Sequence, residues 1–534
     1  MRVLFLVLLL ALVSSHAQKT AMFQKFDKRV LKIREKLHNL KDKIRKKLQL
    51  SEAQNVVLKD LLKYVGNITI ARISSRGDSI TAINGNSNGI GELLYQGDIV
   101  LTQQQADEIA KDIENGQTSR SKRQAFKDYN YPNTIWSKGV YFYFDTDAGA
   151  GEQVKRAFIL GAQMWQKDTC INFYESNKAS PRVRVISADG CWSYVGKLSQ
   201  EQQDLSLGSG CEVPGIAAHE IGHALGFFHT HSRYDRDRFI TLNTRNIEPG
   251  WLDQFNLESG DTNDNYGITY DYGSIMHYGA HSSSMNKEPT MIPHDPRFIE
   301  TLGSYFISFY ELLMMNKHYK CTAICDSQQS AQCQNGGFPH PRNCRKCICP
   351  SGYGGDFCDQ RPPGCGQVLR ADTKPNTFRN VVGDKRRGQV RRETYDICTY
   401  WITAPTGNRV EVMIKSLSQG ANTDGCTLWG VEINTQQDQR HTGYRHLLYS
   451  FMMTVTASGT GPSGPVLPNT QIPTVDPRKP IRPGGPSGPN TQTSGSCTDD
   501  RKCTYLRSTN FCRDGSFPPS VKQNLCPTMC GLCR

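Results

Sequence analysis

The 534-residue sequence lacks features that several classes of protein require. After the first 17 residues, no segment stays apolar over the roughly 20 residues that a membrane-spanning helix needs. The body of the chain has little surplus of basic charge, because the first 123 residues hold 21 Lys and Arg against 12 Asp and Glu, which leaves 42 against 38. No cysteine precedes Cys170. The sequence therefore predicts no membrane span in the mature protein and no nucleic-acid-binding body.

The N-terminus and the cysteines indicate a secreted protein. Arg2 precedes an apolar run, Val3–Val13, and the small-residue stretch Ser15–Ala17 follows, which is typical of a secretory signal peptide over 1–17. The alternative is an anchor helix, although the run is about half the length of a membrane span. The 19 cysteines are dense in 321–365 and 497–533, as in disulfide-rich extracellular modules. Nineteen is odd, so at least one thiol has no intramolecular partner.

Residues 18–123 are predicted to form an activation prosegment. A basic helix in 18–50 carries an apolar stripe at Phe23, Phe26, Val30, Ile33, Leu37, Leu40 and Ile44. This stripe predicts a helix that packs on the domain it guards; a short coiled coil or a surface for anionic matrix or membrane is the alternative. Asn67 begins the only glycosylation sequon. Arg120-Ser121-Lys122-Arg123 is typical of a proprotein-convertase site, so cleavage after Arg123 would leave Gln124 as the mature N-terminus.

From residue 124 the pattern changes to that of an α+β domain. Val140–Phe144 and Val183–Ile186 are predicted strands, and Gln153–Lys167 is a predicted helix. These elements favour a two-part domain with a mixed sheet and long helices over 124–321. A six-cysteine module follows over 322–359, then a strand-rich region over 365–457. A linker rich in Pro, Gly and Ser covers 459–496, and a second six-cysteine knot covers 497–533.

The stretch His219-Glu220-Ile221-Gly222-His223-Ala224-Leu225-Gly226-Phe227-Phe228-His229 carries the chemistry. On a helix, His219 and His223 project from one face and can share a metal ion. Gly226 can adopt the left-handed backbone that ends the helix, so the chain turns and brings His229 round as a third ligand. Three imidazoles leave a coordination position open, as in a catalytic zinc site, and Glu220 is placed to take a proton from the metal-bound water. The extended spacing is the signature of metzincin proteases.

A methionine turn is expected after such a helix, and Ser274-Ile275-Met276-His277-Tyr278 supplies one. Met276 would lie beneath the metal, and a tight turn would bring Tyr278 within reach of it. Taken alone, a Met and a Tyr in one segment are more often ordinary core residues.

With these motifs and Arg233-Tyr234-Asp235-Arg236-Asp237, residues 124–321 resemble the astacin family of zinc metalloendopeptidases. The resemblance implies a metzincin fold with one Zn²⁺ per chain. It also implies that Tyr278 is a further zinc ligand that swings away to support the oxyanion, and that disulfides join Cys170–Cys321 and Cys191–Cys211. One position departs from the family, which usually has Glu after the third histidine, where it meets the buried mature N-terminus. Here that position is Thr230, so this chain needs another anchor or has a mobile N-terminus.

The resemblance extends into the prosegment. Leu94-Tyr95-Gln96-Gly97-Asp98-Ile99 resembles the family's aspartate-switch motif, in which a prosegment carboxylate occupies the open zinc position. Asp98 is therefore the predicted zymogen latch, and a cysteine latch is excluded because the region has no Cys. The alternative is an ordinary Gly-Asp turn.

The order of modules resembles nematode-type astacins with EGF-like, CUB and ShKT modules. The EGF-like resemblance implies the pairs Cys325–Cys344, Cys333–Cys347 and Cys349–Cys358. The CUB-like region has three cysteines where four are normal, with Cys365–Cys398 paired, so Cys426 is the predicted free thiol and this β-sandwich is expected to be truncated. The ShKT resemblance implies Cys497–Cys533, Cys503–Cys526 and Cys512–Cys530.

Two functional hypotheses remain. The first is a secreted endopeptidase, latent until the prosegment is cut, that hydrolyses internal bonds of extracellular matrix or cuticle proteins. Its partners would be those substrates and an activating proprotein convertase, with no nucleic acid and with an unknown oligomeric state. The second is a matrix-binding scaffold with a vestigial protease domain, although the retained triad, Glu220 and Tyr278 favour the enzyme. The residue after the scissile bond is expected to be selected by loops near Ser283–Pro293.

Overall fold

The computed structural model shows two compact units. It describes residues 28–65, 74–75, 77–115, 124–258, 263–325, 330–383, 394–417, 423–446, 450–458, 503–506, 511–513, 522–523 and 526–532. The larger unit is formed by Met1–Pro363, Asp384–Asp396 and Gln419–Tyr449, and the smaller by Gly364–Gly383, Ile397–Ser418 and Ser450–Arg534. The predicted signal peptide, Asn67, Arg123, the linker 459–496, Cys497 and Cys533 lie outside the described residues.

The larger unit is built on a six-stranded sheet in the order β1-β6-β7-β5-β3-β4. Its strands are β1 (Ile99–Val100), β3 (Val140–Phe144), β4 (Phe173–Glu175), β5 (Arg182–Ile186), β6 (Cys191–Tyr194) and β7 (Gln202–Leu207). Only the β6–β7 pair of this sheet is antiparallel. The two strands predicted in the protease domain are confirmed. β1 comes from the prosegment, and it extends the sheet at the β6 edge with Ile99 opposite Ser193.

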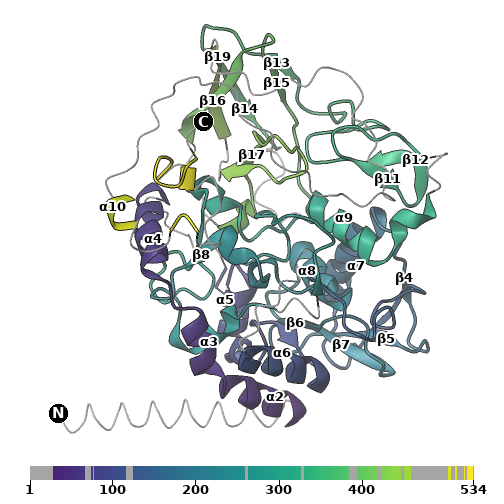
Figure 1. Ribbon diagram of the computed structural model, residues 1–534. Coiled ribbons are helices and arrows are strands. Elements are labelled where there is room, and N and C mark those ends of the chain that lie inside the picture. The colour runs from purple at the N-terminus through teal and green to yellow at the C-terminus, as the bar shows by residue number, and fades with distance from the viewer. Residues whose placement is uncertain are drawn as a thin grey trace, which may run out of the picture. The chain divides into compact units, whose positions relative to one another are not determined.

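Two helices pack closely within this unit, α7 (Glu152–Lys167) and α8 (Pro214–Ala224) (Figure 1). The buried face of α7 includes Val154, Phe158 and Trp165, at the spacing of an amphipathic helix. Gly161 allows the close approach, because a Cβ there would lie 2.8 Å from the backbone nitrogen of Ala218. The Trp165 indole also donates a hydrogen bond to the Ala218 carbonyl over 2.8 Å. The predicted helix at 153–167 is confirmed.

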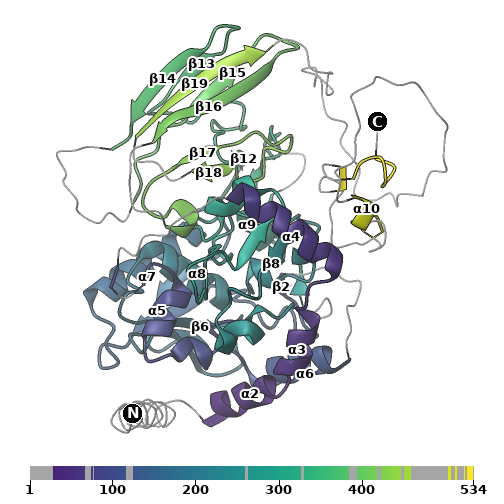
Figure 2. The same cartoon turned by 90° about the vertical axis from the view of Figure 1, so that its left-hand side faces the viewer.

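The predicted prosegment, 18–123, which is called the prosegment below, is mainly helical where the structure describes it. Its elements are α2 (Lys28–His38), α3 (Lys41–Lys47), α4 (Glu52–Val65), α5 (Ile80–Asn86), η1 (Ile90–Glu92) and α6 (Gln103–Asn115). The expected single basic helix is divided between α2 and α3, because Leu40 bonds to the Leu37 carbonyl, three residues back, at a break that includes the poor helix former Asn39. Phe23 and Phe26 lie outside the described residues, but the apolar stripe is buried from Val30 to Ile44. Val30 packs in one cluster with Ile186 and Trp192 of the protease domain. Figure 2 shows α2, α3 and α6 together.

Short elements complete the larger unit. Those of the protease domain are β2 (Ala125–Phe126), η2 (Thr230–Ser232), η3 (Arg236–Arg238), β8 (Ile240–Leu242), η4 (Pro249–Phe255), β9 (Asn263–Asp264), β10 (Met291–Pro293), η5 (Pro296–Thr301), α9 (Phe309–His318) and η6 (Cys321–Ile324). Those that follow are β11 (Phe338–His340), β12 (Asn343–Ile348), η8 (Asp424–Cys426), β17 (Val431–Ile433) and β18 (Tyr444–His446). Four two-stranded ribbons form, β2–β9, β8–β10, β11–β12 and β17–β18.

The smaller unit contains β-structure and a short helix. Its elements are β13 (Val368–Arg370), β14 (Asn376–Val381), β15 (Trp401–Thr403), β16 (Arg409–Leu417), β19 (Ser450–Ser458) and α10 (Cys503–Leu506). β13 and β15 are parallel, whereas β14, β19 and β16 form an antiparallel sheet, which Figure 2 shows. The region predicted as one CUB-like domain, 365–457, is thus shared, because 423–446 belongs to the larger unit.

Eight disulfides join the described cysteines. They are Cys170–Cys321, Cys191–Cys211, Cys325–Cys344, Cys333–Cys347, Cys349–Cys358, Cys365–Cys398, Cys503–Cys526 and Cys512–Cys530. Cys426 is a buried free thiol, and burial raises its pKa to about 12, so it is not a reactive thiolate. Among the described helices, none has both the length and the apolarity to span a bilayer.

Candidate metal centre and active site

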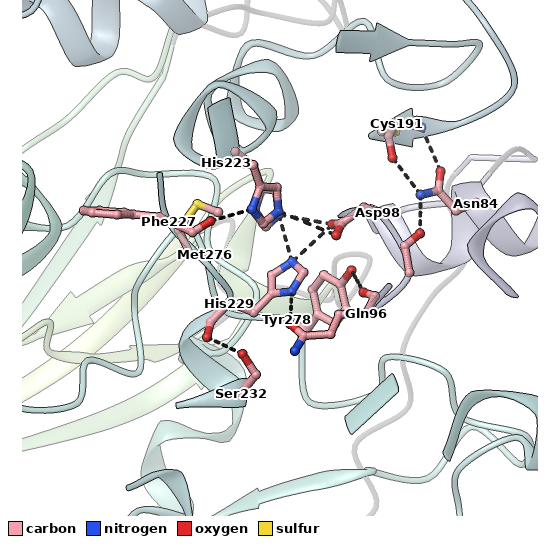
Figure 3. Close-up of polar contacts among 12 residues, drawn as sticks. Asn84, Gln96, Asp98, Cys191, His223, Phe227, His229, Ser232, Met276 and Tyr278 are labelled. Atoms are coloured by element: carbon pink, nitrogen blue, oxygen red, sulfur yellow. Dashed lines mark hydrogen bonds and ion pairs between the residues drawn. The ribbon is translucent and has the colours of Figure 1, made fainter. Parts of the chain in front are cut away.

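The three histidines converge because of how α8 begins and ends. Pro214 starts the helix, where its missing N–H costs nothing, and His219 and His223 follow one turn apart on its buried face. The helix ends at Ala224, and Gly226 has φ +112°, a left-handed conformation that only glycine adopts without strain. The chain turns there, and His229 returns to meet the rings of His219 and His223. Figure 3 shows His229 beside His223.

The hydrogen bonds of the three rings define their tautomers. Nδ1 of His219 lies 2.7 Å from the Ile275 carbonyl, and Nδ1 of His223 lies 2.7 Å from the Phe227 carbonyl. Nδ1 of His229 lies 2.8 Å from Oε1 of Gln96. Since these oxygens can only accept, each Nδ1 carries the proton, and each Nε2 presents a lone pair.

The three Nε2 atoms face one another. Nitrogen lone pairs are arranged in this way only around a cation. The Nε2 atom of His219 lies 3.1 Å from that of His223 and 3.3 Å from that of His229. A tetrahedral zinc with bonds of about 2.0–2.1 Å to nitrogen separates its ligand atoms by roughly 3.3 Å. Burial lowers the pKa of His223, and lowers that of His229 to about 3, so both rings stay neutral and able to bind metal at neutral pH. The donor set therefore fits Zn²⁺.

The fourth member of the cluster is Asp98 of the prosegment. One carboxylate oxygen lies 3.2 Å from Nε2 of both His219 and His229, and the other lies 3.5 Å from Nε2 of His223. All four ligand atoms lie within 4.8 Å of one another, and all four side chains are buried. Figure 3 shows the carboxylate pointing at the rings of His223 and His229. Asp98 thus lies where a fourth ligand of the metal would be.

Glu220 differs from the buried carboxylates around it. It is fully buried, and neither of its oxygens has a hydrogen-bond partner among the described residues. Burial raises the pKa of Glu220 well above its usual range, and the nearby charge of Asp98 adds to this. A buried polar group without a partner is costly, and such groups concentrate at functional sites. This carboxylate is available to a small polar group bound beside the metal.

The methionine turn lies directly under the metal helix. Gly222 of α8 makes room for Met276, because a Cβ at Gly222 would lie 2.6 Å from the Met276 sulfur. Tyr278 lies over the histidines, with its ring centroid 4.4 Å from that of His229. Its hydroxyl donates a hydrogen bond of 2.5 Å to the Gln96 carbonyl of the prosegment. In this form of the protein, the Tyr278 hydroxyl is held by the prosegment.

The prosegment holds the β6 edge by backbone and side-chain contacts. The Asn84 amide accepts from the Cys191 N–H over 2.8 Å and donates to the Cys191 carbonyl over 2.7 Å, as a paired strand would. It also donates to the Gly97 carbonyl over 2.8 Å, which connects α5 to the turn before Asp98. The prosegment therefore occupies the β6 edge from Asn84 to β1. Between these two points it crosses the metal centre.

Thr230 takes part in a different anchor from the one usual in the family. Nε2 of Gln124 donates to the Thr230 hydroxyl over 2.9 Å, and that hydroxyl lies 2.6 Å from the Ser274 hydroxyl. Ser274 in turn donates to the Glu311 carboxylate. Gln124 is buried, and its carbonyl accepts from the Phe228 N–H. The first residue after the predicted cut is thus tied to the third histidine's loop and to the methionine turn.

A histidine–aspartate pair, His281 and Asp424, lies beside the cavity that His219 also lines. His281 bonds through Nδ1 to Asp424 over 2.9 Å, and the His281 N–H donates to the same carboxylate over 3.0 Å. Asp424 and His219 line one cavity, together with Tyr278, Tyr305 and the prosegment residues Asp78–Ile80. Tyr305 donates to the Asp78 carbonyl over 3.0 Å. A segment far along the chain therefore contributes to the cleft.

Sequence reasoning missed several residues of this site. Asn84, Gln96, Glu258, Glu311 and Asp424 contact it only through the tertiary structure. Gln96 lies in the motif around Asp98, for which only Asp98 was given a role. The other four belong to no spaced motif, so no local signal distinguishes them from other polar residues of the sequence. The loop Ser283–Pro293 includes β10, and its predicted role in selecting the residue after the scissile bond stays a prediction. The cavity beside His219 is lined by residues that include Ser282, Gly303, Ser304 and Asp424.

The fold and site define a class, the zinc peptidases whose helix supplies two histidines and whose following turn supplies the third. Comparison with known proteins agrees: the model of the peptidase family Astacin matches residues 128–320. Zinc metalloproteinase nas-31 of Caenorhabditis elegans is 48% identical over 399 residues, which are 74% of this chain and 64% of that protein. Zinc metalloproteinase nas-29 of the same organism is 35% identical over 401 residues, 71% of this chain and 73% of its own length.

Among solved structures, the high choriolytic enzyme 1 of Oryzias latipes, a hatching enzyme zinc-protease, matches with 29% identity and a TM-score of 0.32, over 37% of this chain and 94% of that chain. The relatives show that this chain belongs to the astacin family of zinc metalloproteinases. The predictions of that family, of its enzyme class and of zinc as the cofactor are confirmed. The chain spans slightly less than two thirds of the length of nas-31.

Proposed function

We propose that this protein is a secreted endopeptidase, made as a latent zymogen and activated by a convertase cut after Arg123. The observation that carries the proposal is the Asp98 carboxylate, which faces the Nε2 atoms of His219, His223 and His229 at 3.2–3.5 Å. A carboxylate is a competent zinc ligand, and as the fourth ligand it denies that position to a substrate. Secretion is supported by eight disulfides, which form and persist in oxidising compartments.

The proposed substrates are extended segments of extracellular proteins, of the matrix or cuticle type. The prosegment supports an extended substrate, because β1 pairs with the β6 edge and Asn84 imitates a strand beside it. A peptide can add to such an edge through main-chain hydrogen bonds once the prosegment leaves. The EGF-like, CUB-like and ShKT-like regions are proposed to dock the enzyme on those substrates.

The chain's own residues would perform the hydrolysis as follows. Zinc, when bound, polarises the scissile carbonyl and makes a water molecule more acidic. Glu220, which has no partner among the described residues, takes a proton from the attacking water and later gives it to the leaving amine. Tyr278 loses its Gln96 acceptor when the prosegment leaves, so its hydroxyl is free to donate to the carbonyl oxygen as negative charge develops there. The Nδ1 bonds of the histidines keep the rings oriented throughout.

The proposal predicts that Glu220→Gln abolishes proton transfer while leaving the fold intact. In the activated full-length protein, kcat on a quenched fluorescent peptide should fall by about 10²–10⁴-fold, the usual contribution of a general base. A zinc chelator should silence the wild type, and added zinc should restore it. Glu175→Gln, on an exposed residue of β4, is the matched control and should retain full activity. Equal turnover by wild type, Glu220→Gln and chelated protein would refute the mechanism.

A further inference from the structure

Glu258 is a buried carboxylate that the mechanism does not use. It follows η4 and is 3% exposed. One of its oxygens accepts two hydrogen bonds from the prosegment, from the Tyr95 hydroxyl over 2.7 Å and from Nε2 of Gln96 over 2.6 Å. No Lys or Arg forms an ion pair with it in the part of the chain that the structure describes. The neutral hydrogen-bond donors of Tyr95 and Gln96 in the prosegment thus cover the Glu258 carboxylate of the protease domain.

Gln96 shows how close Glu258 lies to the reacting centre. Its amide oxygen accepts from Nδ1 of His229 over 2.8 Å, its carbonyl accepts from Tyr278 over 2.5 Å, and its amide nitrogen donates to Glu258. One residue therefore spans from the zinc ligand to Glu258. Gln96 has φ +50°, an unusual conformation for a residue with a side chain, and these three bonds hold it there.

Loss of the prosegment removes both donors at once. Burial raises the pKa of Glu258 to about 7 in the zymogen, so neutral donors satisfy this carboxylate without holding it firmly in the charged form. When Tyr95 and Gln96 leave, the oxygen that accepts from both of them loses these two donors, and among the described residues only the neutral amide of Asn263 remains beside the carboxylate. A carboxylate in such a place binds best to a cation, and Arg can satisfy it with two parallel hydrogen bonds.

We propose that Glu258 forms a specificity subsite of the mature enzyme that recognises an Arg or Lys side chain of the substrate, and that Tyr95 and Gln96 fill this subsite in the zymogen. The inference rests on the proposed release of the prosegment. It assigns a preference for basic residues at one substrate position near the scissile bond.

A binding selection tests this without requiring turnover. Full-length protein carrying Glu220→Gln is cut after Arg123, freed of its prosegment and incubated with a randomised octapeptide library, and the retained peptides are sequenced. Arg and Lys should be enriched at one position. A fluorescein-labelled peptide from that selection should bind more tightly than its citrulline counterpart by roughly 10–100-fold, the range expected for hydrogen bonds to a charged group.

Adding Glu258→Gln should remove both the enrichment and the Arg-to-citrulline difference, while Glu175→Gln on β4 should leave them unchanged. An enrichment that survives Glu258→Gln, or equal binding of the Arg and citrulline peptides to the parent protein, would overturn the subsite. Because Glu220→Gln serves as the parent, this result is independent of hydrolysis. Peptide cleavage by the activated wild type reports separately on the proposed function.

Discussion

The role of each buried carboxylate in this protein depends on the groups that its side chain faces rather than on the residue type. Asp98 and Glu220 are both fully buried carboxylates near the same metal site. Asp98 faces three imidazoles and is proposed to act as a ligand, whereas Glu220 has no partner in the described structure and is available to a water molecule. Glu258 faces a phenol and an amide and holds the prosegment. In the proposed function, the same functional group thus serves as ligand, as base and as anchor.

At this scale, Asp98→Ala should weaken latency without destroying the fold of the prosegment. Asn84, β1 and α2 still hold the prosegment in place, so the uncut variant should be only partly active. We expect its peptidase activity to exceed that of the uncut wild type by at least about tenfold, which corresponds to a lost interaction of roughly 1.4 kcal/mol. Activity would be measured with a convertase inhibitor present. If uncut Asp98→Ala stays as silent as uncut wild type but becomes fully active once cut, Asp98 is not the latch.

At the scale of elements, hydrogen bonds to the Glu311 side chain join the methionine turn to α9. The Glu311 carboxylate accepts from the Ile275 N–H over 2.9 Å, the Met276 N–H over 3.1 Å and the Ser274 hydroxyl. It also accepts from the Ser308 N–H over 2.9 Å, which completes the capping box at the start of α9. The helix cap and the floor of the metal site therefore share one acceptor.

We expect Glu311→Gln to destabilise the turn, because the amide's NH₂ group would face backbone N–H groups that need an acceptor. The free energy of unfolding should fall by about 1–3 kcal/mol, and Tm by roughly 2–4 °C per kcal/mol for a domain of this size. Thermal unfolding of the activated protein would measure the change in Tm, and a peptide assay would measure the change in kcat. Glu152→Gln, on an exposed side chain of α7, is the control and should change neither. A Glu311→Gln protein with unaltered Tm and kcat would contradict this role.

At the scale of the whole molecule, residues 423–446 belong with the protease domain although they follow β16 of the smaller unit. Tyr444 donates to Asp295 over 2.8 Å, Arg445 to the Ser304 hydroxyl over 2.7 Å, and Tyr310 to Asp438 over 2.8 Å. Asp424 reaches the cavity that His219 lines. The active-site cleft is therefore built from the prosegment, the protease domain and this later segment.

This arrangement predicts a pH-dependent contribution from the His281–Asp424 pair. Burial opposes the charged form of His281, but the Asp424 carboxylate outweighs it and raises the pKa of the imidazole. A raised folded-state pKa stabilises the fold below the unfolded pKa of about 6.5, and the contribution disappears as pH rises through the folded value. Asp424→Asn should therefore lower Tm more at pH 5.5 than at pH 8.5.

The expected difference between the two pH values is on the order of 1 kcal/mol, and thermal unfolding of the full-length protein would measure it. Asp356→Asn removes an exposed pair with Lys346 and should have an effect below about 0.5 kcal/mol at both pH values. A Tm loss for Asp424→Asn that does not depend on pH would show that the pair stabilises the fold only through its hydrogen bonds.

The sequence by itself determined what depends on local spacing. Two histidines four residues apart share a helical face, and Gly226 allows the chain to reverse. His229 and the methionine turn then follow at the sequence spacing that the motifs specify. The amphipathic pattern of α7 and the strands at 140–144 and 183–186 were likewise local.

Only the tertiary structure decided which distant groups meet at the metal. Asp98, 121 residues before His219, was expected there only through the resemblance of its motif. Glu258 contacts Gln96 across 162 residues, and Asp424 contacts His281 across 143, and no motif indicated either pair. Each of these contacts arises because polar groups that become buried or partly buried must find partners once the sheet and helices bring them together, and no local periodicity records that pairing. The same reason explains why the anchor of Gln124 at Thr230 and the membership of 423–446 in the protease unit became evident only in the folded chain.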